Sequence, residues 1–600
     1  MVQGKKLIVA TTRPELLFGC VCLFVNPDDS RYTEYIGKKA IVPLYNYEIP
    51  ILADEKVDIE KGTGVVMCAT FGDTTDVEWY EKYKLPYRKV IEIDGTISKD
   101  TPIIAGLKVK EAREKIIECL KENNLLIKSE NIIHTVSVHD RCINPIEIIC
   151  SKQWYIDILS EKERYLKAAD EINWYPSYMK NKYISWVENL KWDWCISRQR
   201  YFGVPFPIWY CKKCGEPIYA AESQLPVNPL EDKPIGTCSC GCKEYIAENA
   251  VFDTWATSSL TPMINAGWGT NRDYSDKLIP MGMRTQAHEI IRTWAFYTIV
   301  RSLYHLGRLP WKDIMISGFV LAKRGEKISK SKNNGILSPS ELIKKHSADS
   351  LRYWAASTKL GTDTMFSEED LKLSKRFLTK LWNGSKFAIM QLDDYIGEKP
   401  AELMIIDQWI LNKLAKVEEV VTKYLAAYEI GLAKQEIDKF FWTDFCDNYI
   451  EITKDRLYKP EIHGQQERKS AQYALYHVLL EILKMYSIYV LYITEEIYQS
   501  FYRGFEKEIS IHKLEWNKEF IYDDEILEFG EMVKEIISEV RKYKSEKNLS
   551  LKEEINILEI NLEADKIIYL EQTIKDIKSC TWAKEIRINE TDSFRMNICQ

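Results

Sequence analysis

The spacing of apolar residues changes along the chain, and each change predicts a different kind of structure. Residues 5–130 alternate short runs rich in β-branched residues with turns, as at 7–11, 39–42 and 64–67. Such runs predict strands, and one longer amphipathic stretch at about 109–124 predicts a helix among them. This first part of the chain is therefore expected to form a compact α/β domain.

The rest of the chain passes from a mixed pattern to a helical one. Residues 150–190 are mostly helical in pattern, and from 250 to 360 helices alternate with strands as in a parallel α/β sheet. Beyond about residue 370 the apolar spacing predicts a helical bundle, and the last segment alternates helix and strand. One helix face is formed by Ile410, Leu414, Val417, Val421 and Tyr424. The predicted fold class is α/β with several domains.

The composition is that of a globular chain without a membrane segment. Its 600 residues are too many for one hydrophobic core, so roughly three or four domains are expected. No apolar run approaches the ~20 residues that span a bilayer, and the N-terminus has no signal-peptide layout. Fifteen cysteines without such a signal indicate a reducing compartment, so we expect a cytoplasmic location. The net charge of −7 means that a nucleic-acid partner would be held by local basic patches.

Five cysteines in two groups predict a structural zinc site. Cys211 and Cys214 lie three positions apart, which is the spacing of a zinc knuckle. The second group, Cys238, Cys240 and Cys242, offers three sulfurs where two are needed. Cys238 and Cys240 are favoured because a glycine follows Cys240 as one follows Cys214, and Cys242 is the rival ligand. Four sulfur ligands would leave no open position on the metal for catalysis, so the site would be structural. The alternative to a zinc site is a set of unrelated buried thiols.

A loop of lysines and serines lies in the middle of the chain. Residues 326–332 read Glu-Lys-Ile-Ser-Lys-Ser-Lys, with Lys327 and Lys330 three positions apart and Ser329 and Ser331 beside them. Two ammonium groups at this spacing can hold a polyphosphate and neutralise the charge that grows as an α–β phosphate bond breaks. A solvated surface turn is the alternative.

Two further groups of polar residues precede this loop. Asp253 and Trp255 combine an acid, which can hold an amino group, with an aromatic pocket wall. Gln286, His288 and Glu289 stand at an expected helix start, which suits hydrogen bonds to a ribose or phosphate. The alternatives are a capped helix start for the first group and a structural histidine for the second.

The order of these groups along the chain is more specific than any one of them. The chain resembles the class I aminoacyl-tRNA synthetases, whose motifs occur in the same order as residues 194–202, 253–259, 288–294, 327–331 and 348–354. The sequence at 286–297 is similar to archaeal-type valyl-tRNA synthetases, and 441–458 is similar to their anticodon-binding helices. The resemblance covers essentially the whole chain, and isoleucyl-tRNA synthetase is the nearest competitor.

The resemblance implies a set of substrates and a division into domains. A valyl-tRNA synthetase condenses valine with ATP, accompanied by Mg²⁺, to valyl-adenylate and then transfers valine to tRNA-Val. Lys327 and Lys330 would hold the ATP phosphates, while Asp253 and Trp255 would line the amino acid site. The implied domains are a barrel-like α/β editing domain, the second half of a Rossmann-like catalytic domain with a zinc knuckle at 205–245, a helical anticodon-binding domain and a small α/β tail. Their expected limits are 1–145, 146–365, 366–520 and 521–600.

The resemblance also implies an editing site in the first domain. A valine pocket rejects threonine by only about 10²-fold, so a second site hydrolyses Thr-tRNA. The ester and the terminal adenosine would be contacted by Thr11, Thr12 and Arg13. The ammonium and hydroxyl of the threonine would be bound by Asp73 and Asp76, which could also orient water. The chain departs from the family pattern at Leu16, Met67 and Ala69, where relatives carry Thr, Lys and Thr. A β-rich domain with capped turns is the alternative.

A basic stretch near the C-terminal end is a further candidate for contact with the tRNA backbone. It contains Arg541, Lys542, Lys544 and Lys547. Because a run of charges on a helix is usually solvated, we expect a solvated helix face instead.

One signature of the family is absent from the sequence. The chain contains no His-x-Gly-His element, whose imidazoles bind ATP phosphates in the family, and His305-Leu-Gly-Arg is the closest imitation. We therefore expect the parallel sheet to be incomplete, with an unpaired edge, and the isolated chain not to form valyl-adenylate. A gene fragment, or a separate polypeptide that carries the missing half, would explain this.

Two other functions fit the same residues. The first is a stand-alone tRNA-binding, trans-editing deacylase that hydrolyses Thr-tRNA without any synthetic activity. The second is a degenerate binding module in which the motifs are relics. Retention of Lys327 and Lys330 disfavours the relic, and deacylation of mischarged tRNA would support the deacylase.

Overall fold

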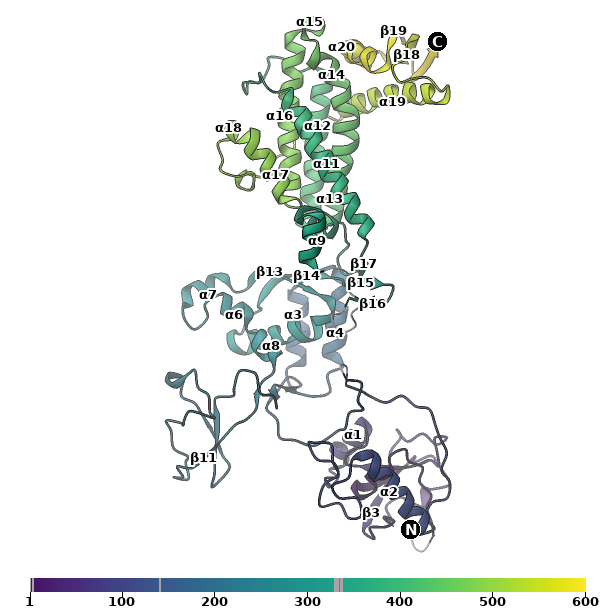
Figure 1. Ribbon diagram of the computed structural model, residues 1–600, viewed down its shortest axis with the longest axis vertical. Helices are drawn as coiled ribbons and strands as arrows, with labels where there is room; N and C mark the ends of the chain where they lie inside the picture. Colours follow the sequence, from purple (N-terminus) through teal and green to yellow (C-terminus); the bar gives the residue numbers. More distant parts are fainter. Residues whose placement is uncertain (1, 3–4, 140–141, 329–333, 335–337, 600) are drawn as a thin grey trace. The chain divides into compact units, whose positions relative to one another are not determined.

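The chain folds into two compact units, residues Met1–Trp154 and Tyr155–Gln600. The computed structural model in Figure 1 describes all residues except 1, 3–4, 140–141, 329–333, 335–337 and 600. Among the described residues, no helix is both long and apolar enough to cross a membrane.

The first unit is built on a mixed four-stranded sheet that is open at both ends. Its central strand β1 is buried along its whole length and pairs in parallel with β3 and antiparallel with β4. The strand order is β2-β3-β1-β4, with bounds Lys39–Ile41, Glu48–Ala53, Cys20–Val25 and Val65–Ala69. The run at 7–11, which its alternating pattern predicts as a strand, is not one. Its residues stay partly or fully exposed and join no sheet.

Two helices of the first unit carry its chemistry and its packing. Helix α1 (Thr74–Tyr83) begins at Asp73, whose side chain accepts hydrogen bonds from the N–H groups of Thr75 and Asp76. This N-cap satisfies donors that the first helical turn leaves free. Trp79 on α1 stacks on Phe24 of β1 with ring centroids 4.3 Å apart. The predicted helix at 109–124 is confirmed as α2 (Val109–Glu122).

The second unit contains the parallel sheet that the sequence predicts. Strand β14 (Trp311–Ser317) lies between β13 (Met281–Ala287) and β6 (Asn173–Tyr175), and both pairings are parallel. Among the described residues, β13 and β6 are therefore the two outer strands of this sheet. Helices α3 (Lys162–Glu171), α4 (Lys180–Glu188) and α8 (Phe296–Leu306) belong to the same region.

Two small sheets extend from this region. Strand β15 (Val320–Lys323) pairs with β16 (Glu326–Lys327) and β17 (Thr364–Met365), so the first lysine of the lysine–serine loop stands on a hairpin. In the cysteine-containing insert, β9 (Ile208–Cys211) lies between β10 (Pro217–Tyr219) and β11 (Tyr245–Ala247).

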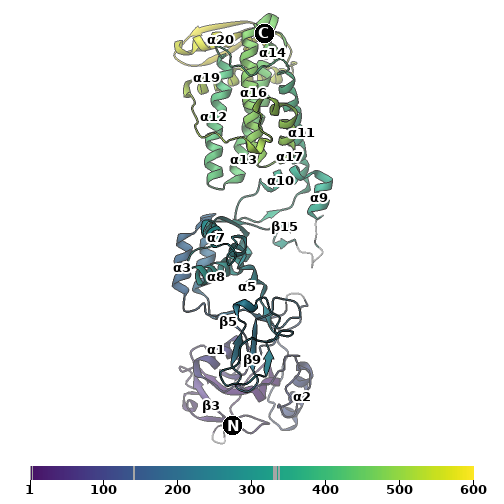
Figure 2. The ribbon, with the colours of Figure 1, turned by 90° about the vertical axis from the view of Figure 1, so that its left-hand side faces the viewer.

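A helical bundle follows, as predicted, and Figure 2 shows its long helices running beside one another. Ile410, Leu414, Val417 and Val421 are buried on α12, which confirms the predicted helix face, while Tyr424 packs partly buried against it. The helices are α11 (Glu368–Met390), α12 (Ile405–Ala426), α13 (Ile430–Lys439), α14 (Ile450–Tyr458), α16 (Gln465–Ser487) and α17 (Leu491–Ile497).

The chain ends in a small α/β element whose core is continuous with that of the bundle. Its sheet order is β19-β18-β20, with bounds Ala583–Glu590, Ile555–Leu562 and Arg595–Cys599, and its helices are α19 (Asp524–Glu546) and α20 (Ala564–Thr581). The expectation for Lys544 is wrong. Its ammonium is buried and donates to the carbonyls of Leu551 and Thr581, both at 2.9 Å, because α19 turns this side toward the sheet.

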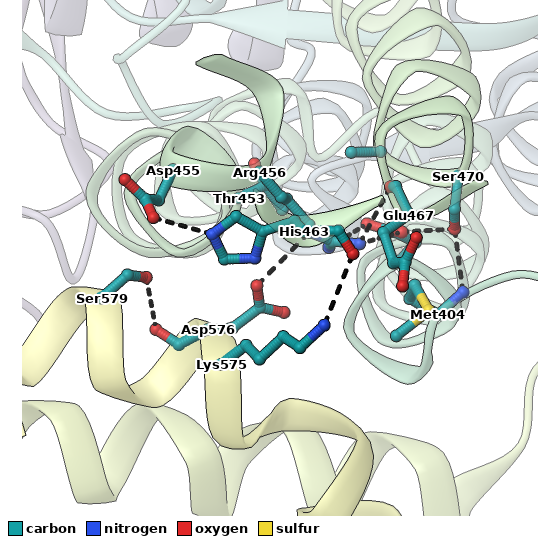
Figure 3. A network of polar contacts seen from close by, with 12 residues as sticks. Met404, Thr453, Asp455, Arg456, His463, Glu467, Ser470, Lys575, Asp576 and Ser579 are labelled. Carbon is teal, nitrogen blue, oxygen red and sulfur yellow. Dashed lines mark hydrogen bonds and ion pairs between the residues drawn. The ribbon is translucent and has the colours of Figure 1, made fainter. Parts of the chain in front are cut away.

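A buried ionic network joins α20 to the bundle (Figure 3). Arg456 on α14 donates to both oxygens of Asp407 on α12, at 2.8 and 2.9 Å. The same carboxylate accepts hydrogen bonds from Tyr449 and Ser470. On its other side, Arg456 Nε lies 3.4 Å from Asp576 on α20. Asp407 is thus fully satisfied, whereas Asp576 depends on one longer contact.

Candidate functional site

The first lysine of the lysine–serine loop is held by a carboxylate and an aromatic ring. Lys327 Nζ lies 2.5 Å from Glu289 Oε2 and 4.1 Å from the ring centroid of Phe319. The structure therefore brings two of the predicted residues, Lys327 and Glu289, together. Ser329, Lys330 and Ser331 lie outside the described residues.

The neighbouring histidine, His288, is held by an acid that no sequence motif marks. His288 begins the short helix η5 (His288–Ile290), and its Nε2 lies 2.9 Å from Asp363 Oδ1. The same oxygen accepts a hydrogen bond from the Phe319 N–H at 2.8 Å. Gln286, two residues before His288, is buried on β13 and has an oxygen without a hydrogen-bond partner in the described structure.

A cavity of about 450 Å³ opens beside these residues. On one side, His288, Glu289 and Phe319 line it. On the other side, Lys182 and Trp186 come from α4, a helix in which sequence patterns gave no sign of a ligand site. The cavity is large enough for a nucleoside-sized ligand and is lined by cations, an acid and aromatic walls.

Asp253 and Trp255 lie in a second cavity, of about 290 Å³. The pairing of β8 (Ser197–Arg198) with β12 (Val251–Phe252) brings Arg198 to the same place, with its Nη2 3.3 Å from Asp253 Oδ2. Asp253 is thus buried beside a cation rather than free to hold an ammonium alone. Sequence patterns placed Arg198 in a separate motif.

A tryptophan of the His288–Trp294 segment stands next to the helix that starts at Asp253. The Trp294 indole N–H donates to the Ser258 carbonyl at 3.2 Å, and Ser258 is the last residue of α5 (Thr254–Ser258). The guanidinium of Arg284 on β13 packs on the Trp294 ring, and burial lowers the Arg284 pKa to about 9. The two motifs are therefore in direct contact.

The four favoured cysteines form one cluster. The sulfurs of Cys211, Cys214, Cys238 and Cys240 all lie within 4.8 Å of one another, as the ligands of one tetrahedral ion do. Cys242 instead directs its sulfur to the Glu244 carbonyl, 3.7 Å away. Backbone N–H groups of Cys214 and Lys213 lower the pKa of Cys211, which favours its thiolate, whereas hydrogen bonds among the neighbouring thiols raise the pKa of Cys214 and of Cys240.

In the first unit, Arg13 and Asp76 meet at Gly72. Arg13 Nη1 donates to the Gly72 carbonyl at 3.3 Å, and the Gly72 N–H donates to Asp76 Oδ2 at 2.8 Å. Buried Glu15 and half-buried Glu147 accept from the other guanidinium nitrogens of Arg13 at 3.1 and 2.5 Å. The predicted residues Arg13, Asp73 and Asp76 are thus neighbours.

The other predicted residues of the first unit take less part in this arrangement. The Thr11 hydroxyl accepts the Arg13 N–H, and Thr12 is exposed. Leu16 is buried close to Asp76, since a Cβ placed on Gly72 would lie 2.9 Å from Asp76 Oδ2 and 3.5 Å from Leu16 Cδ1. Burial among such neighbours raises the pKa of Asp76 to about 7.

Comparison with protein families gives two matches that together cover most of the chain. The model for "tRNA synthetases class I (I, L, M and V)" matches residues 41–367. The model for "Anticodon-binding domain of tRNA ligase" matches residues 407–560. The first match contains the cysteine cluster and both cavities, and the second contains most of the helical bundle.

Curated relatives extend the similarity to nearly the whole chain. The chain is 45% identical to the valine–tRNA ligase of Rickettsia conorii, over 99% of this chain and 74% of that protein. It is also 45% identical to the valine–tRNA ligase of Rickettsia prowazekii, with the same coverage. These comparisons do not support a separate polypeptide that carries a missing half.

Comparison with solved structures gives a partial match. Mycobacterium tuberculosis methionyl-tRNA synthetase in complex with methionyl-adenylate matches with a TM-score of 0.48 and 18% identity, over 61% of this chain and 66% of that one.

Proposed function

The chain belongs to the valine–tRNA ligase family of class I aminoacyl-tRNA synthetases, and from this premise we propose that it acts in the ATP-dependent attachment of valine to tRNA-Val. Editing would reside in residues 1–145, phosphate and valine binding in 146–365, anticodon binding in 366–520 and a structural tail in 521–600. The observation that carries the proposal is the exposed Lys327–Glu289 pair, in which Glu289 lines the 450 Å³ cavity.

The proposed ATP site uses the loop lysines as phosphate ligands. When ATP–Mg²⁺ binds, Lys327 would exchange Glu289 for a phosphate oxygen, and Lys330 would contact the same polyphosphate, with Ser329 and Ser331 as donors. Both members of the Lys327–Glu289 pair are about half exposed, with side-chain exposures of 48% and 49%, so this exchange costs little. Gln286, His288 and Glu289 would bind the ribose.

The proposed valine site is the smaller cavity. Trp255 forms a wall there, and Asp253 would accept the valine ammonium. Because Arg198 already lies 3.3 Å from Asp253, the acid would share its charge between the guanidinium and the ammonium. The net charge of the cavity would then suit a zwitterionic amino acid, whose carboxylate Arg198 or Arg200 could pair with.

Discrimination among tRNAs tests this function directly. The proposal predicts that the purified chain binds tRNA-Val more tightly than tRNA-Ile at equal salt concentration, because base contacts at the anticodon discriminate while phosphate contacts do not. Filter binding at several salt concentrations measures both affinities. Equal affinities for the two tRNAs, or a preference for tRNA-Ile, would contradict the valine assignment.

A structural zinc ion is the second part of the proposal. Cys211, Cys214, Cys238 and Cys240 would hold it as thiolates and so fix the β9–β11 insert. Elemental analysis is expected to find one zinc ion per chain. Cys242 supplies the matched control: Cys242→Ser should keep the ion, whereas Cys240→Ser should lose it. Retention of zinc by the Cys240 variant would overturn this ligand set.

The arrangement around Gly72 favours a second activity, hydrolysis of Thr-tRNA. Arg13 would bind the terminal adenosine or the ester, with Thr11 and Thr12 beside it, and Asp73 and Asp76 would bind the threonine ammonium and hydroxyl. Deacylation of mischarged Thr-tRNA-Val measures it. Asp76→Ala should abolish the reaction, whereas Asp28→Ala, at an exposed acid of the same unit, should not. Absence of deacylation by the unaltered chain would rule the activity out.

A further inference from the structure

Asp363 is a carboxylate that joins two separate parts of the phosphate-binding region. It lies between α10 (Ala348–Ala355) and β17, far in sequence from the residues that it contacts. Its Oδ1 accepts one hydrogen bond from the Phe319 N–H at 2.8 Å and one from His288 Nε2 at 2.9 Å. The Phe319 turn follows β14, whereas His288 follows β13, so one oxygen ties the ends of two parallel strands.

These contacts close a ring of interactions around Lys327. The His288 and Phe319 rings meet edge to face, with centroids 4.6 Å apart. Lys327 lies over the Phe319 ring, with Nζ 4.1 Å from the ring centroid, and pairs with Glu289, the residue next to His288. Of the two residues against the Lys327 ammonium, Phe319 is therefore bonded to Asp363, and Glu289 is adjacent to His288, which is bonded to it.

The backbone around Asp363 is itself held in place. The Thr364 N–H donates to the Phe319 carbonyl at 2.8 Å, so the two segments are bonded on both sides of the Asp363 side chain. Gly318 allows this approach, because a Cβ at Gly318 would lie 2.0 Å from the Thr362 carbonyl oxygen. Asp363 is thus a rigid reference point rather than a mobile surface acid.

The charge of Asp363 also determines the state of His288. The Phe319 N–H and the His288 ring lower the pKa of Asp363, so the group is ionised at neutral pH. An ionised carboxylate accepts hydrogen bonds only, which requires that His288 Nε2 carry the proton. In neutral His288, Nδ1 is then an acceptor.

We propose that Asp363 is a positioning residue, which fixes the tautomer of His288 and the place of Phe319 and thereby aligns Lys327 for the phosphates of ATP. The inference rests on the proposed role of Lys327. Asp363 itself touches neither phosphate nor valine in this account. It acts through the two residues that it holds.

The test measures ATP–Mg²⁺ affinity of the full chain by calorimetry for Asp363→Ala, Asp363→Asn and Asp313→Asn. Asp363→Ala should weaken ATP affinity about 5- to 20-fold, since small misplacements of a binding group are costly. Asp363→Asn keeps an oxygen that accepts both hydrogen bonds, so it should restore most of the affinity. Asp313→Asn is the control, because Asp313 lies on β14 and bonds Asn173 and Tyr428 instead.

A second readout separates positioning from simple structural support. Nitrogen chemical shifts of labelled histidine should show His288 protonated at Nε2 in the unaltered chain and a mixture of tautomers in Asp363→Ala. Unchanged tautomer and unchanged ATP affinity in Asp363→Ala would overturn the inference. The inference would also be overturned if Asp363→Ala lowered thermal stability and tRNA affinity as much as ATP affinity. Such a result would indicate a general structural role.

Lys327→Ala shows which proposal fails. If Lys327→Ala weakens ATP binding while Asp363→Ala does not, the inference about Asp363 is wrong and the phosphate role stands. If Lys327→Ala leaves ATP affinity unchanged, the phosphate role is wrong, and the positioning role falls with it.

Discussion

Arg456 in the helical bundle and Lys327 in the β15–β16 hairpin each hold a carboxylate, in opposite surroundings. The side chains of Arg456 and Asp407 are 1% and 0% exposed, whereas those of Lys327 and Glu289 are 48% and 49% exposed. A buried cation cannot leave its partner without leaving an uncompensated charge in the core. An exposed lysine can exchange a carboxylate for a phosphate at little cost. Burial therefore separates the ion pairs that stabilise the fold from those that can take part in binding.

The first unit repeats the contrast between two buried acids. Glu15 receives Arg13 at 3.1 Å and Arg113 at 2.8 Å, so its charge is balanced. In the part of the chain that the structure describes, no lysine or arginine pairs with Asp76, which is bonded by the Gly72 N–H. Glu15 therefore belongs with Asp407 as a structural acid, and Asp76 is the acid whose charge state can change.

The largest expected effect is on the buried pair of the bundle. Asp407→Ala removes the partner of a buried arginine, so the free energy of unfolding of the bundle should fall by about 3–5 kcal/mol. Urea unfolding measures it. The matched control is Asp447→Ala, which removes an exposed pair with Lys380 and should cost less than about 1 kcal/mol. Equal costs for the two variants would show that burial does not separate the two kinds of pair.

A second effect should appear in the pH dependence of the first unit. The pKa of Asp76 is raised to about 7 in the folded state, above its unfolded value. Stability from this group is therefore fully present at low pH and is lost as pH rises through about 7. Hydrogen exchange of α1 between pH 5 and 8, corrected for the intrinsic rate, measures this loss. In Asp76→Asn the contribution should vanish, and an unaltered slope would contradict the assignment.

The smallest effect should come from the other acid of the buried network. Burial raises the pKa of Asp576 to about 6, and Arg456 Nε contacts it at 3.4 Å. Its stabilising contribution is thus lost as pH rises through about 6, and the ionised form is poorly compensated at pH 7. Asp576→Asn should therefore change the free energy of unfolding at pH 7 by less than about 1 kcal/mol. A loss as large as that of Asp407→Ala would show that the two acids are equivalent.

The features that depend on local spacing could be predicted from the sequence. Cys211, Cys214, Cys238 and Cys240 meet in one cluster, because two tight turns bring each pair of sulfurs to one side. The buried face of α12 follows in the same way from the 3.6-residue period of a helix.

The features that depend on contacts between distant segments could not be predicted. Asp363 and His288 are 75 residues apart, and nothing near Asp363 marks it as a partner of an imidazole. Arg198 meets Asp253 only because β8 pairs with β12. Lys544 has the sequence surroundings of a surface lysine, but the packing of α19 against the C-terminal sheet buries it among carbonyls. Tertiary packing decided each of these outcomes.

The role of Lys327 in phosphate binding is tested most directly by comparing two lysines of one hairpin. Lys323 on β15 pairs with Glu326 at 2.9 Å and is exposed, so it matches Lys327 in charge, whereas Lys327 pairs with Glu289, which lines the cavity. Equilibrium binding of ATP–Mg²⁺ should weaken by about tenfold or more in Lys327→Ala, because a charge-assisted bond to phosphate is lost. In Lys323→Ala it should change by less than about twofold. Equal affinities in the two variants would contradict the account.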